Sequence, residues 1–273
     1  MPQINQQLIR KQEQARSSTG RLSKIALAAT LTLGMAPSVS VAGDFAYETM
    51  VYVDAAREPV EVHTTILVGD SVYDWEEQRA LVIDFVNRKL VLLDARIQQK
   101  TTLDFAGMEW RLGQKKLMLN EQVQKGDARS KELAAFLLQP AYNITGDGDS
   151  KVVQFADPRV TYKISVIKPA DEDIRQKLSR YLDFTTRLSA IQNPWGFARM
   201  PVNTWLHQHD MVPMRVEREQ PVPNSPQKSR VRSQHEIREQ LSAKDRTKID
   251  EIEFWMKDFR GVDFDTYQEK VRK

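Results

Sequence analysis

The segment from Leu81 to Leu93 (LVIDFVNRKLVLL) contains two short apolar runs separated by Asn87 and Arg88. If both runs are strands, every second side chain points to the same side, and both sides are apolar. One face would carry Leu81, Ile83, Phe85, Leu90 and Leu92, and the other Val82, Val86, Val91 and Leu93. A strand pair that is apolar on both faces must be covered on both. We expect helices on one face and a ligand, a lid or a second sheet on the other; the alternative is that helices cover both faces and nothing binds.

The same segment predicts a hairpin between residues 81–86 and 89–94. We expect Phe85 opposite Leu90 and Ile83 opposite Leu92, with Asn87 in the turn because Asn tolerates a positive φ.

Period-two alternation extends over residues 44–104 and predicts an antiparallel meander of short strands. From about Leu112 the period changes to that of helices, with a break near Gly126 and Asp127. Strands return over 142–167, and the clearest helix is Asp171–Ile191, whose acidic first turn suits the helix dipole. A C-terminal helix is expected over 242–260, where Ser242 and Asp245 have capping-box spacing. The predicted fold class is therefore α+β: a curved, half-barrel-like antiparallel sheet packed on α-helices.

Two strands near the C-terminus, Val212–Glu219 and Arg230–Arg238, are expected to pair antiparallel across a Pro-rich loop. Opposite charges predict the register Glu217 to Arg232 and Glu219 to Arg230. The same register places Val216 by Ser233, Met214 by His235 and Val212 by Ile237 on the inner face. It also turns Arg218 inward, close to the loop.

Residues 1–42 have the three parts of a cleavable Sec signal peptide, in order. A basic region precedes the apolar stretch Ile25–Ala36, and Ser40-Val41-Ala42 has small residues at the positions that signal peptidase reads. The apolar stretch is too short for a spanning helix, which needs about 20 residues. We therefore expect an exported chain, periplasmic or secreted, with one α+β domain over 43–273 and no transmembrane span after cleavage.

Most of the excess of basic over acidic residues lies in this leader. The chain has 40 Lys and Arg against 37 Asp and Glu, and without the leader it is close to neutral. This balance argues against a nucleic-acid partner. Cysteine is absent from the sequence, so a core must stabilise the fold without disulfides.

The stretch within Val68–Thr102 (GDSVYDWEEQRALVIDFVNRKLVLLDARIQQKT) resembles the meander of exported half-barrel proteins of the LolA type, the lipoprotein carriers. Two later segments, WGFARMPVNTWLHQHDMVPMRV and SQHEIREQLSAKDRTKID, resemble an uncharacterised family of exported proteins from planctomycete-type bacteria. The half-barrel resemblance implies a sheet curved around a helix, with a concave apolar face that shelters acyl chains in the carriers. It implies no catalytic residue and no cofactor.

Aromatic residues within or near the meander are the candidate ligand-binding residues: Tyr52, Tyr73, Trp75 and Trp110. No metal site is predicted. His207 and His209 lack the i,i+4 spacing of a helical zinc pair, Asp147-Gly148-Asp149 suits a hairpin turn, and Asp171–Asp173 suits a helix start.

The sequence contains no nucleophile elbow, cysteine or phosphate-binding loop, so no catalytic residue is assigned. We expect a non-enzymatic binding protein of the cell envelope or medium, holding an apolar small molecule or an envelope protein partner on its curved sheet. The alternatives are a hydrolase with a scattered active site and a purely structural envelope protein.

Overall fold

The computed structural model describes residues 43–222 and 227–271, so the predicted signal peptide lies outside the described residues. The first half contains β1 (Phe45–Val53), β2 (Glu61–Val68), β3 (Ser71–Glu76), β4 (Arg79–Asp84), β5 (Lys89–Asp94), β6 (Gln99–Asp104), α2 (Phe105–Lys125) and α3 (Ala128–Leu138). The second half contains β7 (Asn143–Thr145), β8 (Val152–Asp157), β9 (Val160–Ile167), α4 (Glu172–Gln192), α5 (Trp195–Gln208), β10 (Val212–Pro221), β11 (Lys228–Arg238), α6 (Ala243–Asp258), β12 (Arg260–Gly261) and α7 (Phe264–Val271).

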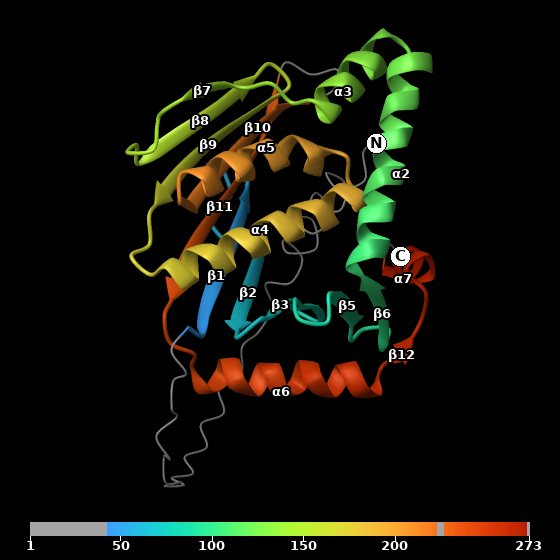
Figure 1. The fold of residues 1–273 in the computed structure, drawn as a ribbon, viewed down its shortest axis with the longest axis vertical. Coiled ribbons are helices and arrows are strands. Elements are labelled where there is room, and N and C mark those ends of the chain that lie inside the picture. Colours follow the sequence, from blue (N-terminus) through green and yellow to red (C-terminus); the bar gives the residue numbers. More distant parts are fainter. Residues whose placement is uncertain (1–42, 223–226, 272–273) are drawn as a thin grey trace, which may run out of the picture.

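The twelve strands of the described residues form one open, curved sheet in the order β12-β6-β5-β4-β3-β2-β1-β11-β10-β9-β8-β7. It consists of two antiparallel meanders, β1 to β6 and β7 to β11, joined where β1 pairs with β11. The short β12 is parallel to β6. Helices α4 and α5 lie across one face (Figure 1), which we call the core face. The predicted α+β class with a curved antiparallel sheet is confirmed.

The hairpin β4–β5 forms as expected, but its predicted register is wrong by two residues. Ile83 pairs with Leu90 and Leu81 with Leu92. The turn is longer than predicted because the Asp84 carboxylate accepts from both the backbone N–H (2.8 Å) and the side-chain amide (2.7 Å) of Asn87. The positive φ falls on Arg88, at 52°, and not on Asn87.

Both faces of this hairpin are covered by helices. On the core face, Leu81, Ile83 and Leu90 join a large apolar cluster with residues of α2 to α5. On the opposite face, Val82, Val91 and Leu93 pack against α6. The helix α6 contributes Ile252 and Trp255, and the adjacent Phe259 stacks on Trp255 at 5.5 Å. The second face of the hairpin is therefore covered by a helix, where a ligand, lid or second sheet was expected.

The predicted register of β10 and β11 is confirmed over the pairs from Arg215 to Pro221, including Glu217 with Arg232 and Glu219 with Arg230. The ladder does not extend to Val212 and Ile237, and an irregularity interrupts the pairing of β10 with β9 between Pro213 and Arg215.

Side chains cap the starts of α2 and α4, whereas α5 has no side-chain cap. Asp104 accepts from the Gly107 N–H, so α2 starts at Phe105, earlier than the apolar period indicated. Asp171, which was predicted to lie in the first turn of α4, is its N-cap. Helix α5 begins at Trp195, and Pro201 lies inside it.

Helices α4 and α5 approach each other closely at Gly196. A Cβ at this position would lie 2.5 Å from the Ala190 nitrogen and 2.8 Å from its Cβ. A Cβ at Gly113 of α2 would meet nothing within 4 Å among the described residues outside its own stretch of helix. A side chain at position 196 would therefore clash with α4, whereas one at position 113 would have room.

We expect Gly196→Ala to lower the free energy of unfolding by about 1–3 kcal/mol, because backbone atoms of α4 must move. The matched Gly113→Ala should raise it by up to about 1 kcal/mol, because alanine favours a helix interior. Urea unfolding of both variants measures this, and equal effects of the two substitutions would contradict it.

The start of α6 is tied to the sheet by Asp245. This buried carboxylate accepts from the Ser242 backbone N–H at 2.7 Å in a capping box, and from both terminal nitrogens of Arg238 on β11 at 2.9 and 3.2 Å. Although burial opposes ionisation, Arg238 and Ser242 outweigh it and lower the pKa of Asp245.

Asp245→Asn should therefore lower the free energy of unfolding by about 2–4 kcal/mol, because the amide places a donor against Arg238 inside a buried pair. Denaturant unfolding measures the loss. Asp250→Asn, at an exposed position of the same helix, is the control and should change stability little.

Candidate metal centre

A row of polar side chains crosses the core face of the sheet, where apolar residues would be the rule. Thr49 on β1 lies opposite His235 of β11 on one side and His63 of β2 on the other. Thr64 pairs with Trp75, so His63 and Glu76 lie side by side at the end of the β2–β3 ladder. The row continues from Glu76 to Arg79, its partner on β4.

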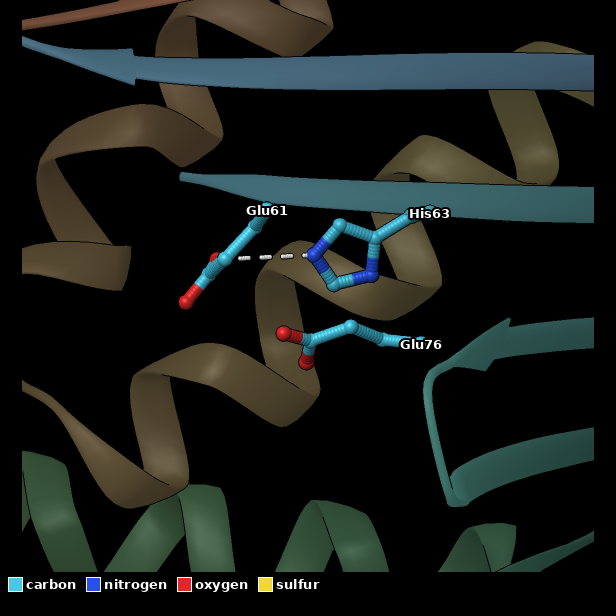
Figure 2. A group of neighbouring side chains, drawn as sticks. All are labelled: Glu61, His63 and Glu76. Atoms are coloured by element: carbon cyan, nitrogen blue, oxygen red, sulfur yellow. Dashed lines mark ion pairs between the residues drawn. The ribbon is translucent and has the colours of Figure 1, made fainter. Parts of the chain in front are cut away.

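Glu61, His63 and Glu76 form the most compact part of this row. Figure 2 shows the Glu61 carboxylate beside the His63 ring, with the Glu76 carboxylate below the two of them in this view. One donor atom from each of the three lies within 4.8 Å of the other two. His63 Nε2 is 3.5 Å from Glu61 Oε2, and Arg79 donates to Glu76 Oε2 at 2.7 Å. Glu76 is buried and the other two are partly exposed.

The charges around His63 favour its protonated form. Burial alone would lower its pKa, but the hydrogen bond to Glu61 and the carboxylates of Asp74, Glu76 and Glu61 outweigh burial and raise it.

The carboxyl of Asp74 lies beside this cluster on β3. Thr65 of β2 donates to Asp74 at 3.3 Å, and Tyr181 of α4 donates at 3.0 Å. Burial raises the pKa of Asp74 despite these two donors and the nearby His63. A carboxyl whose pKa is shifted by burial and by specific partners is a candidate for a functional site.

The structure does not bring the four predicted aromatic residues together. Tyr73 and Trp75 pack against α6, and Tyr73 donates to Glu253 there at 3.1 Å. Tyr52 lies under the Arg232 guanidinium, whose carbon is 4.3 Å from the ring centroid. Trp110 is on α2 with 63% of its surface exposed. Tyr73 and Trp75 thus share contacts at α6, while Tyr52 and Trp110 make other contacts.

The histidines and acidic residues considered in the sequence are occupied in other ways. His207 is hydrogen bonded to Ser179, and His209 stacks on Trp205 at 3.8 Å, near the end of α5. Asp147 accepts from the Asp149 N–H within its turn. Asp171 caps α4.

Sequence reasoning missed Glu61, His63 and Glu76. The available signal was the alternation Glu61, His63, Thr65, Leu67, in which polar residues occupy the same face as a core leucine. The contribution of Glu76 depends on the β2–β3 register, which brings it beside His63.

Comparisons with known proteins add no relative: neither a family model nor a curated protein matches the chain. Across 43–222 and 227–271, no helix is both long and apolar enough to cross a bilayer.

At the other end of the row, His235 is hydrogen bonded at both ring nitrogens, to Thr49 and Ser233, each at 2.9 Å. Its ring stacks on Tyr47 with 5.1 Å between centroids. Burial and the Arg199 guanidinium lower the pKa of His235 to about 3. It is a packing residue that stays neutral.

This low pKa makes stability depend on pH. In the unfolded chain His235 is protonated below about pH 6.5, whereas in the folded chain it is protonated only below about pH 3. Between these two pH values the unfolded chain binds one more proton, so lowering the pH favours unfolding. The stability advantage of wild type over His235→Gln should therefore shrink by up to about 1.4 kcal/mol per pH unit below 6.5. Urea unfolding at pH 7.5, 6.5, 5.5 and 4.5 measures the difference, and a constant gap would contradict the assignment.

Proposed function

We propose that this chain is an exported binding protein that holds one divalent transition-metal ion, best matched by Zn²⁺, between Glu61, His63 and Glu76. The observation that carries the proposal is the convergence of one imidazole and two carboxylates, with donor atoms within 4.8 Å of one another, on two paired strands.

The chemistry of the three donors selects the class of metal. An imidazole nitrogen favours Zn²⁺ over Mg²⁺ and Ca²⁺, which prefer oxygen ligands alone. Ligands on a tetrahedral zinc lie about 3.4 Å apart, given metal–ligand distances of about 2.0–2.1 Å. The three donor atoms already lie within 4.8 Å of one another, and three protein ligands leave a fourth position for water or a ligand.

The surroundings fix the three donors. Glu61 and His63 are on β2, which is held between β1 and β3, and Glu76 ends β3 beside the Arg79 guanidinium. Supporting groups of this kind orient metal ligands.

A metal ion replaces the apolar molecule expected from the sequence as the proposed ligand. The apolar argument rested on the second face of the β4–β5 hairpin, and α6 occupies that face. A protein partner of the envelope stays compatible with a metal site, since an ion with a free coordination position can bind a side chain of another protein.

Isothermal titration of the metal-free protein with ZnCl₂ tests the proposal. We expect one Zn²⁺ per chain and no comparable binding of Mg²⁺. Glu61→Gln and His63→Ala should each weaken Zn²⁺ binding by about tenfold or more, since even supporting residues reach this effect.

The matched control is Glu77→Gln, which changes the exposed neighbour of Glu76 and should leave Zn²⁺ affinity unchanged. Equal affinity of wild type and both ligand variants would exclude the site, and circular dichroism confirms that each variant is folded.

One feature of the same cluster also fits the alternative function, a hydrolase. Catalytic zinc sites have three protein ligands and an open position, and this cluster offers three donors. A hydrolase predicts that the zinc-loaded protein cleaves activated esters or phosphate esters, and that Glu61→Gln abolishes the cleavage. A binding protein takes up zinc without such turnover.

A further inference from the structure

A second polar centre lies on the core face over β1 and β9 to β11, around Arg199 of α5. The Arg199 Nε donates to Asn203 Oδ1 at 2.9 Å, and its guanidinium carbon is 5.4 Å from the Tyr162 ring centroid. The Nη1 nitrogen is buried and has no hydrogen-bond partner among the described residues. Within the same residues Arg199 forms no ion pair.

The groups nearest to this guanidinium carry no negative charge. Burial raises the pKa of Tyr47, Tyr142 and Tyr162, so all three phenols are neutral near pH 7. Two of these hydroxyls donate elsewhere, Tyr47 to the Pro213 carbonyl and Tyr142 to the Ala198 carbonyl. None of the three can balance the charge of Arg199.

A second cation faces the same region. Arg218 of β10 lies opposite Tyr162 of β9, which places it on the core face, as its inward alternation in the sequence indicated. Burial lowers the pKa of Arg199, and the charge of Arg218 lowers it further. Arg218 forms no ion pair with the described residues either.

Arg199 and Arg218 are partly exposed as whole residues, but the Arg199 Nη1 is buried without a partner, which is unfavourable inside a protein. Buried charges are normally paired, and one left alone carries a large desolvation cost. A guanidinium has a planar set of donors that matches the oxygens of carboxylate and phosphate groups. The buried, unpartnered Nη1 of Arg199 and the nearby charge of Arg218 are therefore two of the groups that an anion-binding site needs.

We propose that Arg199, with Arg218, binds the carboxylate or phosphate group of a small ligand between α5 and the β9–β10 strands. This site is separate from the proposed metal centre, which is built on β2 and β3. The proposal does not depend on the metal proposal.

Thermal unfolding with simple anions tests it. Sodium phosphate and sodium acetate are each titrated against wild type, with NaCl at equal ionic strength as the reference. We expect one of the two to raise the Tm in a saturable way. Phosphate alone identifies a phosphate ligand, acetate alone a carboxylate ligand, and no rise with either anion overturns the proposal.

Arg199→Met separates a binding role from a structural one. We expect this variant to bind the effective anion at least about tenfold more weakly, as the loss of a hydrogen bond to a charged group predicts. Without the anion its Tm should be no lower than that of wild type, because an unpaired buried charge has been removed. A lower Tm together with an unchanged anion response would show that Arg199 is a structural residue and would overturn the proposal.

Two further variants complete the test. Arg199→Lys keeps the charge but loses the planar donor set, so its anion response should be intermediate. Arg187→Met removes an exposed arginine of α4 that is paired with Glu109. It should respond to the anion as wild type does, and an equal loss in this control would show that the response is non-specific.

Discussion

The pairing of β1 with β11 holds the two halves of this molecule together. Eight residue pairs, from Ala46 with Arg238 to Val53 with Val231, join two meanders that would otherwise be separate sheets. The Thr49–His235 hydrogen bond within this ladder spans 186 residues. Contacts so distant in sequence form at a high entropic cost, so each meander can assemble locally before the ladder closes. The polar row on the core face exists only once it has closed, because Thr49 lies between His235 and His63.

Much of the fold follows from local rules that the sequence displays. The caps at Asp171 and Ser242 depend on residues two or three positions away, and the strands show their alternation directly. The β10–β11 register was predictable because it places Glu217 opposite Arg232 and Glu219 opposite Arg230. The β4–β5 register was not, because a two-residue slip in a hairpin that is apolar on both faces keeps every side chain on its own face. In that hairpin the hydrogen bonds from Asn87 to the Asp84 carboxylate stabilise a turn that is longer than two residues, and this turn sets the register.

The candidate sites were harder to predict because their residues meet through long-range pairing. Motif spacing reveals ligands that lie on one helix or loop. His63 and Glu76 lie on different strands, and Arg199 and Arg218 lie on a helix and a strand. Arg218 pointing inward was visible in the alternation of β10, but the second cation comes from α5, whose position depends on its packing with α4 at Gly196. In both places polar residues occupy positions that the core would fill with apolar ones. Departures of this kind from the local rules are expected at functional sites.

The two histidines of the row show how the core face is divided electrostatically. His63 and His235 are separated by Thr49 alone, yet their pKa values shift in opposite directions. At His63, burial is outweighed by Glu61, Asp74 and Glu76, and the pKa rises. At His235, burial acts together with Arg199, and the pKa falls to about 3. Adjacent strands are about 4.8 Å apart, so the region around His63, with its carboxylates, and the region around His235, next to Arg199, lie about two strand spacings apart. Neutral Thr49 and His235 separate the two regions, and a single ligand that carries both charges could contact both only if it extended across β1.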